Sequence, residues 1–317
     1  MVSINLRNLN STLPDAFDVF FCSSSFESRC LSAPNKLKRK HFRRVVIVEN
    51  KNGSDYIHNN TQKLLELFGQ KAKVISIDYQ NPLEIADAIL PEIKKDSSGR
   101  KSRILVDVTT FTHELLMIFL KIAAIKKNQV AVTCIYVNAA DYCSYSEVNR
   151  KWLSRGCKDV HSILGYPGLL FPSQKDRLII IVGYEYNRAA DVINALEPNG
   201  LTLVYGSPNN STTEKNREAS KLYSELVEQM AFNFDSVERA EIPCDDPDKA
   251  SERLCEIYKK HFDENIIVIP MNNKLSTIGV AKSIMQTDYV QACYAPAVVY
   301  NERDYSIPGN SCYIYDF

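Results

Sequence analysis

The chain has 317 residues, of which 45% are hydrophobic and 24% charged, a composition that excludes a disordered or low-complexity protein. Its 38 Lys and Arg residues balance 38 Asp and Glu residues, so broad electrostatic binding to DNA or to an anionic membrane is not expected, although a local basic patch could still bind one. The nine cysteines form no CxxC pair, and several lie inside apolar runs. This usage predicts reduced core thiols and a cytoplasmic location.

No segment of the sequence predicts a membrane span or a secretory signal. The longest apolar run, Leu115–Ile125, is interrupted by Lys121 and is shorter than the roughly 20 residues that cross a bilayer. The first 17 residues contain no continuous apolar core of the kind that a signal peptide has. We therefore expect a soluble protein without membrane contact.

Short apolar runs rich in β-branched residues alternate with amphipathic segments along the whole chain. In the first half we expect strands at Asp18–Cys22, Val45–Glu49, Val74–Asp78, Ile104–Val108 and Val130–Asn138, and helices at Glu27–Lys38, Tyr56–Phe68, Pro82–Lys94 and Thr112–Ile125. In the second half we expect strands at Leu178–Val182, Leu201–Tyr205, Val237–Ile242, Ile266–Ile269 and Ala297–Tyr300, and helices at Arg188–Leu196, Thr213–Phe232, Pro247–His261 and Leu275–Met285. This alternation indicates parallel sheets covered by helices on both faces.

The sequence predicts an α/β protein made of two tandem Rossmann-like units. Each unit is expected to be a mostly parallel five-stranded sheet flanked by helices. The first unit is expected at residues 1–142 and the second at residues 178–317. Residues 143–177 form a connector, in which Val160–Leu164 could add a strand and Gly165–Gly168 should reverse the chain.

The two halves carry similar residues in the same order, which indicates an internal duplication. Phe26-Glu27 followed by Arg29 corresponds to Tyr184-Glu185 followed by Arg188, and Asn81-Pro82 corresponds to Asp246-Pro247. Thr109 and Asn138 are separated by 29 residues, as are Asn272 and Asn301. We therefore expect Thr109 to superimpose on Asn272, and Asn138 on Asn301. The alternative is that any two α/β halves share such spacing.

In doubly wound sheets, ligands bind beyond the carboxyl ends of the first and fourth strands. Polar side chains are concentrated after these strands in both halves, and a phosphate could be held there by short hydroxyls, backbone amides and helix N-termini. Each polar residue could equally be a plain helix cap. The candidate ligand-binding residues in these loops are Ser24, Ser25, Thr109, Thr110, Glu185, Asn272 and Lys274.

Three groups of basic residues are also candidates for binding. Arg29 and Arg188 could each hold a phosphate, or could simply pair with Glu27 and Glu185. Lys274 is the only lysine in the sequence of the expected crevice loops, which makes it the better candidate for binding a phosphate. The run Lys36–Arg44 is expected to be a solvated loop, with a protein or nucleic-acid contact as the alternative.

The familiar motifs of several enzyme classes are missing from the sequence. GxGxxG, Walker A, GxSxG and HExxH do not occur, which argues against standard NAD enzymes, P-loop ATPases, α/β-hydrolases and zincins. His113 and Glu114 could form an acid–base pair, although a single histidine is more often structural. The Cys and His spacing shows no metal cluster, so we expect no metal and no cofactor.

Each expected unit has a polar turn after its first strand and a second polar turn after its fourth. The fourth-strand turns read Asp107-Val108-Thr109-Thr110-Phe111-Thr112 and Asn272-Asn273-Lys274. Tandem units of this kind resemble the nucleotide-sensing CARF and SAVED domains of prokaryotic antiviral systems. In that family the fourth-strand turn reads Thr-Gly-Gly-Thr-Lys or similar, and the glycines are missing here. The resemblance implies that two pockets grip one cyclic or linear oligonucleotide. Because no residues are left for an effector domain, it also implies either a separate effector protein or a structural subunit that has lost its ligand.

Three hypotheses follow from this resemblance and from the crevice residues. The first is a non-catalytic nucleotide sensor or scaffold subunit of a defence complex. The second is a phosphodiesterase of the ring-nuclease type, or a nucleoside-processing enzyme, which uses the same crevice. The third is an interaction protein whose duplicated folds serve assembly.

Overall fold

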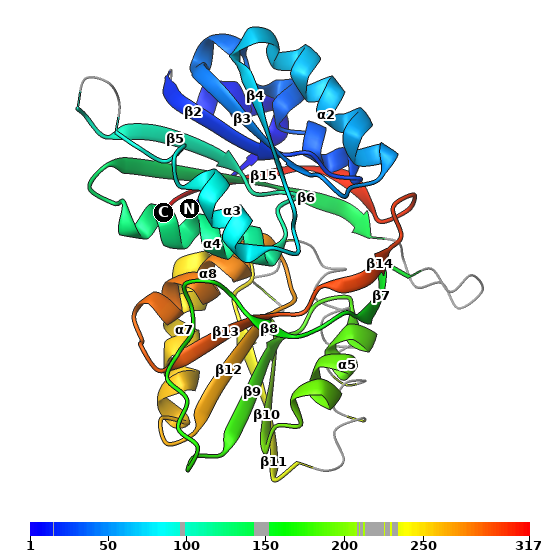
Figure 1. The fold of residues 1–317 in the computed structure, drawn as a ribbon, viewed down its shortest axis with the longest axis vertical. Helices are drawn as coiled ribbons and strands as arrows, with labels where there is room; N and C mark the ends of the chain where they lie inside the picture. Colours follow the sequence, from blue (N-terminus) through cyan, green and yellow to red (C-terminus); the bar gives the residue numbers. More distant parts are fainter. Residues whose placement is uncertain are drawn as a thin grey trace. The chain divides into compact units, whose positions relative to one another are not determined.

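The computed structural model describes residues 1–14, 16–95, 99–142, 152–207 and 234–317, together with residues 209, 212, 225 and 229. The chain divides into two compact units (Figure 1). Unit 1 comprises Met1–Lys151 and Glu302–Phe317, and unit 2 comprises Trp152–Asn301. Most of the helix expected over Thr213–Phe232 lies outside the described residues.

Unit 1 is built on a seven-stranded sheet with the order β1-β15-β6-β5-β2-β3-β4. Its strands are β1 (Val2–Asn5), β2 (Phe17–Ser23), β3 (Phe42–Asn50), β4 (Ala72–Ile77), β5 (Ser102–Asp107), β6 (Val130–Tyr142) and β15 (Ser306–Asp316). Its helices are α1 (Leu9–Thr12), α2 (Asp55–Phe68), α3 (Pro82–Ile89) and α4 (His113–Ile125), with 3₁₀ turns at Leu6–Asn8, Ser28–Leu31, Pro34–Lys36, Arg39–His41 and Gly69–Lys71. Strands β2 to β6 are parallel to one another, whereas β15 runs antiparallel to β6 and β1 antiparallel to β15.

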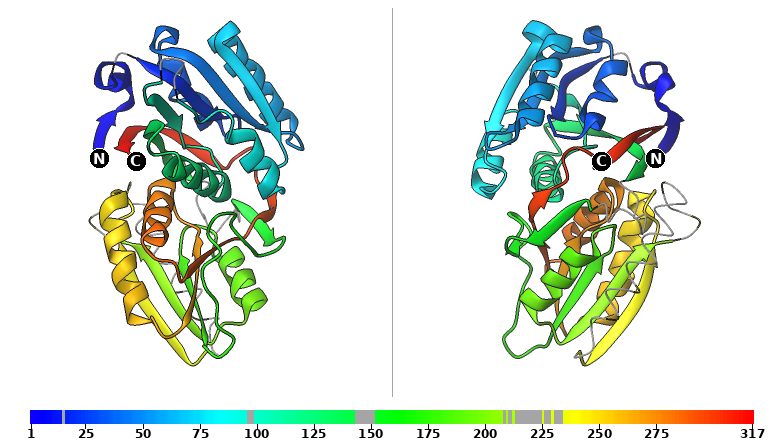
Figure 2. Two further views of the ribbon diagram at one scale, coloured as in Figure 1. Left: turned by 60° about the vertical axis from the view of Figure 1, so that its left-hand side comes forward. Right: turned by 90° about the vertical axis from the view of Figure 1, so that its right-hand side faces the viewer.

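The central strand β2 is buried on both faces because helices cover both sides of the sheet (Figure 2). Successive side chains of a strand point to opposite faces, and the two neighbours Phe20 and Phe21 illustrate this. The Phe20 ring lies 5.6 Å from that of Phe68 in α2, and the Phe21 ring lies 5.2 Å from that of Phe119 in α4. The continuous apolar run of β2 therefore fills two cores at once.

Unit 2 repeats the parallel strand order in a six-stranded sheet, β11-β10-β9-β12-β13-β8. Its strands are β7 (Ser154–Cys157), β8 (His161–Ser162), β9 (Asp176–Ile181), β10 (Gly200–Gly206), β11 (Ser236–Ile242), β12 (Asn265–Pro270), β13 (Val290–Tyr294) and β14 (Ala297–Tyr300). Its helices are α5 (Tyr186–Leu196), α7 (Pro247–Lys260) and α8 (Lys274–Met285). Strands β9 to β13 are parallel, β8 joins β13 antiparallel, and β7 and β14 form a separate two-stranded sheet (Figure 1).

The two sheets confirm a mixed α/β fold of the Rossmann-like type, with five parallel strands in each sheet. The domain boundaries differ from those expected. Residues 302–317 belong to unit 1, because β15 pairs with β6, and the expected connector belongs to unit 2 from Trp152 onward. The strand expected within Val160–Leu164 exists as β8, which pairs with β13.

The expected superposition of Asn138 on Asn301 is wrong. Asn138 lies inside β6, whereas Asn301 follows β14, which is not part of the main sheet of unit 2. The fifth parallel strand of unit 2 is instead β13. Thr109 and Asn272 do occupy corresponding places, each two residues after the end of the fourth parallel strand.

The helix expected at Glu27–Lys38 is replaced by the two 3₁₀ turns Ser28–Leu31 and Pro34–Lys36. Proline has no backbone N–H and its ring clashes with the carbonyl four residues earlier, so Pro34 prevents a continuous helix. The basic run that follows is not a plain loop either, because His41 and Phe42 are buried at the start of β3.

A turn at Gly165–Gly168 reverses the chain before β9, and it depends on glycine. Gly168 has φ +60°, and a Cβ atom there would lie 2.5 Å from the backbone nitrogen of Gln291 in β13. Gly156 has φ +67°, but a Cβ atom there would meet only the Val298 side chain, which is 64% exposed and can move.

We expect Gly168→Ala to destabilise unit 2 more than Gly156→Ala does. Both substitutions carry the strain of a positive φ, about 1–2 kcal/mol, but only Gly168→Ala also forces backbone apart, which costs about 1–3 kcal/mol more. Urea unfolding followed by the fluorescence of Trp152 measures both changes. Equal losses for the two variants would contradict the proposed close approach to β13.

Candidate functional site

The strand order of unit 1 reverses between β2 and β5, and two hydroxyl-bearing loops meet at this point. Ser23 ends β2 and Thr110 lies three residues after β5. Their hydroxyl oxygens are 3.0 Å apart, and the Thr110 hydroxyl also lies 3.3 Å from the Ser23 carbonyl oxygen. Ligands of open α/β sheets bind at such a reversal, and in unit 1 the two loops of the expected crevice are in direct contact.

The predicted site residues of these loops are largely turned inward. Ser24 and Thr109 are buried, and Ser25 is only 8% exposed. The Ser25 hydroxyl accepts a hydrogen bond from the Glu27 amide, while the Thr109 hydroxyl accepts one from the Val137 amide and donates one to Asp107. Among the predicted residues of unit 1, only Thr110 is half-exposed.

Arg29 is held in a buried ion pair. Its Nε and Nη2 atoms donate to Glu27 Oε2 at 2.9 and 2.7 Å, and its Nη1 donates to the Val137 carbonyl. Ser306 of β15 bonds to Glu27 and accepts from Arg29, and the guanidinium lies 5.4 Å from the centre of the Tyr142 ring. The guanidinium is therefore neutralised within unit 1, which is the structural alternative considered for this residue.

Unit 2 contains a similar arrangement after its first parallel strand, β9. Arg188 forms an ion pair with Glu185, and the side chains of the two residues are 5% and 9% exposed. The Ser154 hydroxyl donates to the other carboxylate oxygen of Glu185. Glu185 and Arg188 thus pair with each other rather than facing an open crevice.

The loop after β12 carries the remaining predicted residues, Asn272 and Lys274. The Asn272 amide donates to the Val182 carbonyl at 2.5 Å, and Lys274 begins α8 as a half-buried residue. Gly183 allows the two loops to touch through backbone, since a Cβ atom there would lie 2.2 Å from the Met271 carbonyl oxygen. The two loops of the expected crevice in unit 2 therefore touch through their backbones at Gly183 and Met271.

Asp107 is a buried polar residue of the unit 1 crevice that sequence reasoning did not select. It ends β5 and is 2% exposed, and its Oδ1 atom accepts from the Thr109 amide and hydroxyl. Oδ2 has no hydrogen-bond partner among the described residues. Burial raises the pKa of Asp107 to about 6, although the hydrogen bonds from Thr109 and the charge of Arg29 oppose this rise.

We expect the free energy of unfolding to fall as the pH rises from about 4 to 7, because native Asp107 holds its proton more tightly than it does in the unfolded chain. A rise from 3.8 to about 6 corresponds to about 3 kcal/mol, which is present at low pH and lost above the native pKa. Asp107→Asn keeps an oxygen acceptor for Thr109 but cannot titrate, so it removes this pH-dependent contribution to stability. Urea unfolding followed by circular dichroism from pH 4 to pH 8 should therefore give a flatter profile for the variant, and parallel profiles would refute the assignment.

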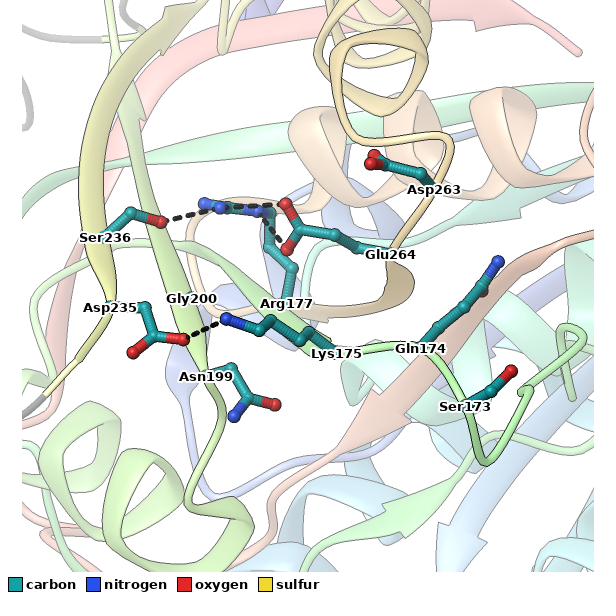
Figure 3. Close-up of a pocket in the computed structure, with 10 residues that line it drawn as sticks. All are labelled: Ser173, Gln174, Lys175, Arg177, Asn199, Gly200, Asp235, Ser236, Asp263 and Glu264. Carbon is teal, nitrogen blue, oxygen red and sulfur yellow. Dashed lines mark hydrogen bonds and ion pairs between the residues drawn. The ribbon is translucent and has the colours of Figure 1, made fainter.

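A polar pocket of about 350 Å³ lies at the other end of the unit 2 sheet (Figure 3). Arg177 donates to both carboxylate oxygens of Glu264 at 2.8 and 3.0 Å, and it also bonds to Thr202 and Ser236. Lys175 pairs with Asp235 at 2.7 Å, but both of these side chains are exposed. The pocket is lined by Ser173, Gln174, Lys175, Arg177, Asn199, Gly200, Asp235, Ser236, Asp263 and Glu264.

We expect Arg177→Gln to destabilise unit 2 by up to about 3–5 kcal/mol, because it removes the arginine that pairs with the partly buried Glu264 carboxylate, which keeps its contact with His261. Lys175→Gln is the matched control in the same pocket, and should change stability by less than about 1 kcal/mol because its ion pair is exposed. Urea unfolding followed by Trp152 fluorescence separates the two effects. Similar losses would show that the Arg177 pair is no more important than a surface pair.

The chemistry that the thiols could supply is limited by burial. Burial raises the pKa of Cys22 above its usual value and that of Cys30 to about 12, so both thiols remain protonated and weakly nucleophilic. Within the described ranges, no group of three His, Cys, Asp or Glu side chains could hold a metal ion. Among the helices that the structure describes, none has the length and apolar character of a membrane span.

Comparison with known proteins finds no matching family model and no matching curated protein. Solved structures with a similar arrangement include the cytoplasmic domain of a prokaryotic cation chloride cotransporter, at 9% identity and a TM-score of 0.27 over 89% of this chain and 96% of that one. The N-domain with NADP of a bacterial malonyl-CoA reductase gives 8% identity and a TM-score of 0.25, over 86% and 79% of the two chains. A short-chain dehydrogenase/reductase from Serratia marcescens BCRC 10948 gives 10% identity and a TM-score of 0.25, over 72% of this chain and 98% of that one. Likenesses at this level do not indicate a shared function.

Proposed function

We propose that the protein is a non-catalytic nucleotide sensor or scaffold subunit that acts with a separate effector in a prokaryotic antiviral defence complex. The observation that supports a ligand site is the contact between Ser23 and Thr110, which joins the two loops at the strand-order reversal of unit 1. Half-exposed Thr110 would offer its hydroxyl to a phosphate or ribose oxygen. The defence role rests on the resemblance of the sequence to CARF and SAVED domains.

The charged residues near the two crevices favour binding over catalysis. General acid–base chemistry needs a titratable group within hydrogen-bond reach of the substrate. Glu27 and Glu185 are instead bound to buried arginines, and Asp107 is itself buried. These groups preserve the shape of the loops and leave neutral hydroxyls and amides for contact with a ligand.

We further propose that the two units arose by internal duplication. Both sheets have the same order of five parallel strands, and both units place a buried Glu–Arg pair with a serine partner after the first of them. The helices α3 and α7 both begin with proline after a capping side chain, Asn81 and Asp246 respectively. Equivalence of these features in an experimental superposition would support a common origin.

The function is tested by incubating the purified protein with cyclic dinucleotides, trinucleotides and tetranucleotides and analysing the bound and free fractions by mass spectrometry. The proposal predicts that one of these compounds is retained intact. A cleaved compound would favour the alternative, a phosphodiesterase or nucleoside-processing enzyme, while the absence of any binding would leave the interaction-protein hypothesis.

For a retained compound, we expect Thr110→Val and Lys274→Ala each to weaken binding. Loss of a charge-assisted hydrogen bond at Lys274 corresponds to about 1.5–3 kcal/mol, or about 10- to 150-fold in Kd. The matched controls are Thr12→Val in α1 and Lys282→Ala, which lies two turns further along α8. If calorimetry finds wild-type affinity in both test variants, the ligand does not contact these loops.

A further inference from the structure

The turns that lead into the parallel strands of unit 1 carry several exposed lysines. Because all starts of parallel strands lie at one edge of a sheet, segments that are far apart in the sequence are brought to the same edge there. Lysines occur before β3, before β5 and before β6. We call this surface the basic edge, and define it by Lys36, Lys38, Lys40, Lys94, Lys95, Lys101 and Lys127.

The side chains of the basic edge are available for binding. All seven lysines are exposed. Their ammonium groups make no ion pair or hydrogen bond with any residue that the structure describes. Nearby arginines, in contrast, are used within the fold. Arg39, for example, donates to the Glu66 and Leu67 carbonyls at the C-terminal end of α2.

The buried carboxylates at this edge are already neutralised. Asp18 accepts from Arg100 at 2.6 and 3.0 Å and lies 3.4 Å from Arg43. Glu92 is paired with Arg44 and Lys73. The exposed carboxylates of Glu66, near the end of α2, and Asp316, which pairs with Thr133 near the start of β6, offset part of the charge of the seven lysines. The basic edge therefore keeps an excess of positive charge.

The same ion pairs hold the basic segments close to one another. Asp18 connects Arg43, just after Lys40, to Arg100, just before Lys101. Lys126 donates to the carbonyls of Leu90 and Ile93 at 2.8 and 2.7 Å, which places Lys127 beside the segment that carries Lys94. The seven lysines thus belong to one continuous surface, although they come from three separate turns.

We propose that the basic edge of unit 1 binds the phosphate backbone of double-stranded nucleic acid. A row of unpaired lysines matches a polyanion with closely spaced charges. Single-stranded nucleic acid is usually held by base stacking on aromatic rings, but Phe17, Phe42 and Phe68 near this edge are all buried. Contact is therefore with phosphates rather than bases, and binding is independent of sequence. This surface is separate from the crevice, so the inference does not require a nucleotide ligand there.

The test measures the salt dependence of binding to a fluorescein-labelled 20-base-pair duplex by anisotropy, with DNA and RNA versions in parallel. Each phosphate contact contributes about 0.9 to the slope of log K against log salt concentration on DNA. Replacing Lys36, Lys38 and Lys40 with Gln should therefore reduce the slope by up to about 2.7. An unlabelled duplex of unrelated sequence should displace the probe as well as the original does.

The matched control replaces Lys249, Lys259 and Lys260 of α7 in unit 2 with Gln, which changes the net charge by the same amount. This variant should keep the wild-type slope, and circular dichroism should show that both variants are folded. The proposal is overturned if the wild-type protein shows no salt-dependent binding, or if the two triple variants lose affinity equally. Tighter binding to phosphatidylglycerol vesicles than to the duplex would also overturn it, and would assign the surface to a membrane.

Discussion

The geometry of parallel strands determines where chemistry can occur in this protein. A parallel sheet places all strand ends at one edge and all strand starts at the other, and its crossover helices cover the faces between them. Polar side chains that do not pack in the core therefore lie mainly at the two edges. In unit 1, the carboxyl edge carries hydroxyls and a buried carboxyl group, whereas the opposite edge carries exposed lysines. The partners that we propose for the two edges differ accordingly: a small polar molecule at the carboxyl edge and an extended polyanion at the basic edge.

Desolvation explains why the charged residues of the crevices are paired. A charge taken out of water is costly unless an opposite charge and further hydrogen bonds compensate for it. Arg29 meets this requirement through Glu27, Ser306 and the Val137 carbonyl, and Arg188 meets it mainly through Glu185. An arginine held in this way keeps its loop in one conformation. To contact a phosphate, it would have to leave a carboxylate behind, which is a second reason to place ligand contacts on neutral groups such as Thr110.

The sequence allowed most of the parallel strands to be predicted, because buried strands such as Leu178–Val182 are apolar without interruption. Prediction from local patterns failed where pairing between distant parts of the chain decides the structure. The pairing of β15 with β6 joins residues that are about 170 positions apart, and no local pattern reveals it. The local pattern favours Ala297–Tyr300 as the fifth strand of unit 2, whereas the structure places Val290–Tyr294 there. That error also produced the wrong superposition of Asn138 on Asn301.

The candidate site was predicted less well than the fold, for a physical reason. Sequence position placed Ser24, Ser25 and Thr109 in the correct loops but could not show that they face inward. A hydroxyl in such a loop either caps backbone groups or faces a ligand, and the two cases have the same sequence. Asp107 was overlooked because an aspartate at a strand end is common, and only the three-dimensional structure shows that its Oδ2 is buried without a partner among the described residues.

Because residues 302–317 return to unit 1, the two units can complete their folds at different times during synthesis. Unit 2 is one continuous segment, so all its strands exist before residues 302–317 are made. Unit 1 is complete only when β15 pairs with β6, and until then the Glu27–Arg29 pair lacks the Ser306 hydroxyl and Cys312 is missing from the core. Domains generally fold as units during synthesis. Unit 2 can therefore fold first, while the loops of unit 1 reach their described arrangement only when β15 has been made.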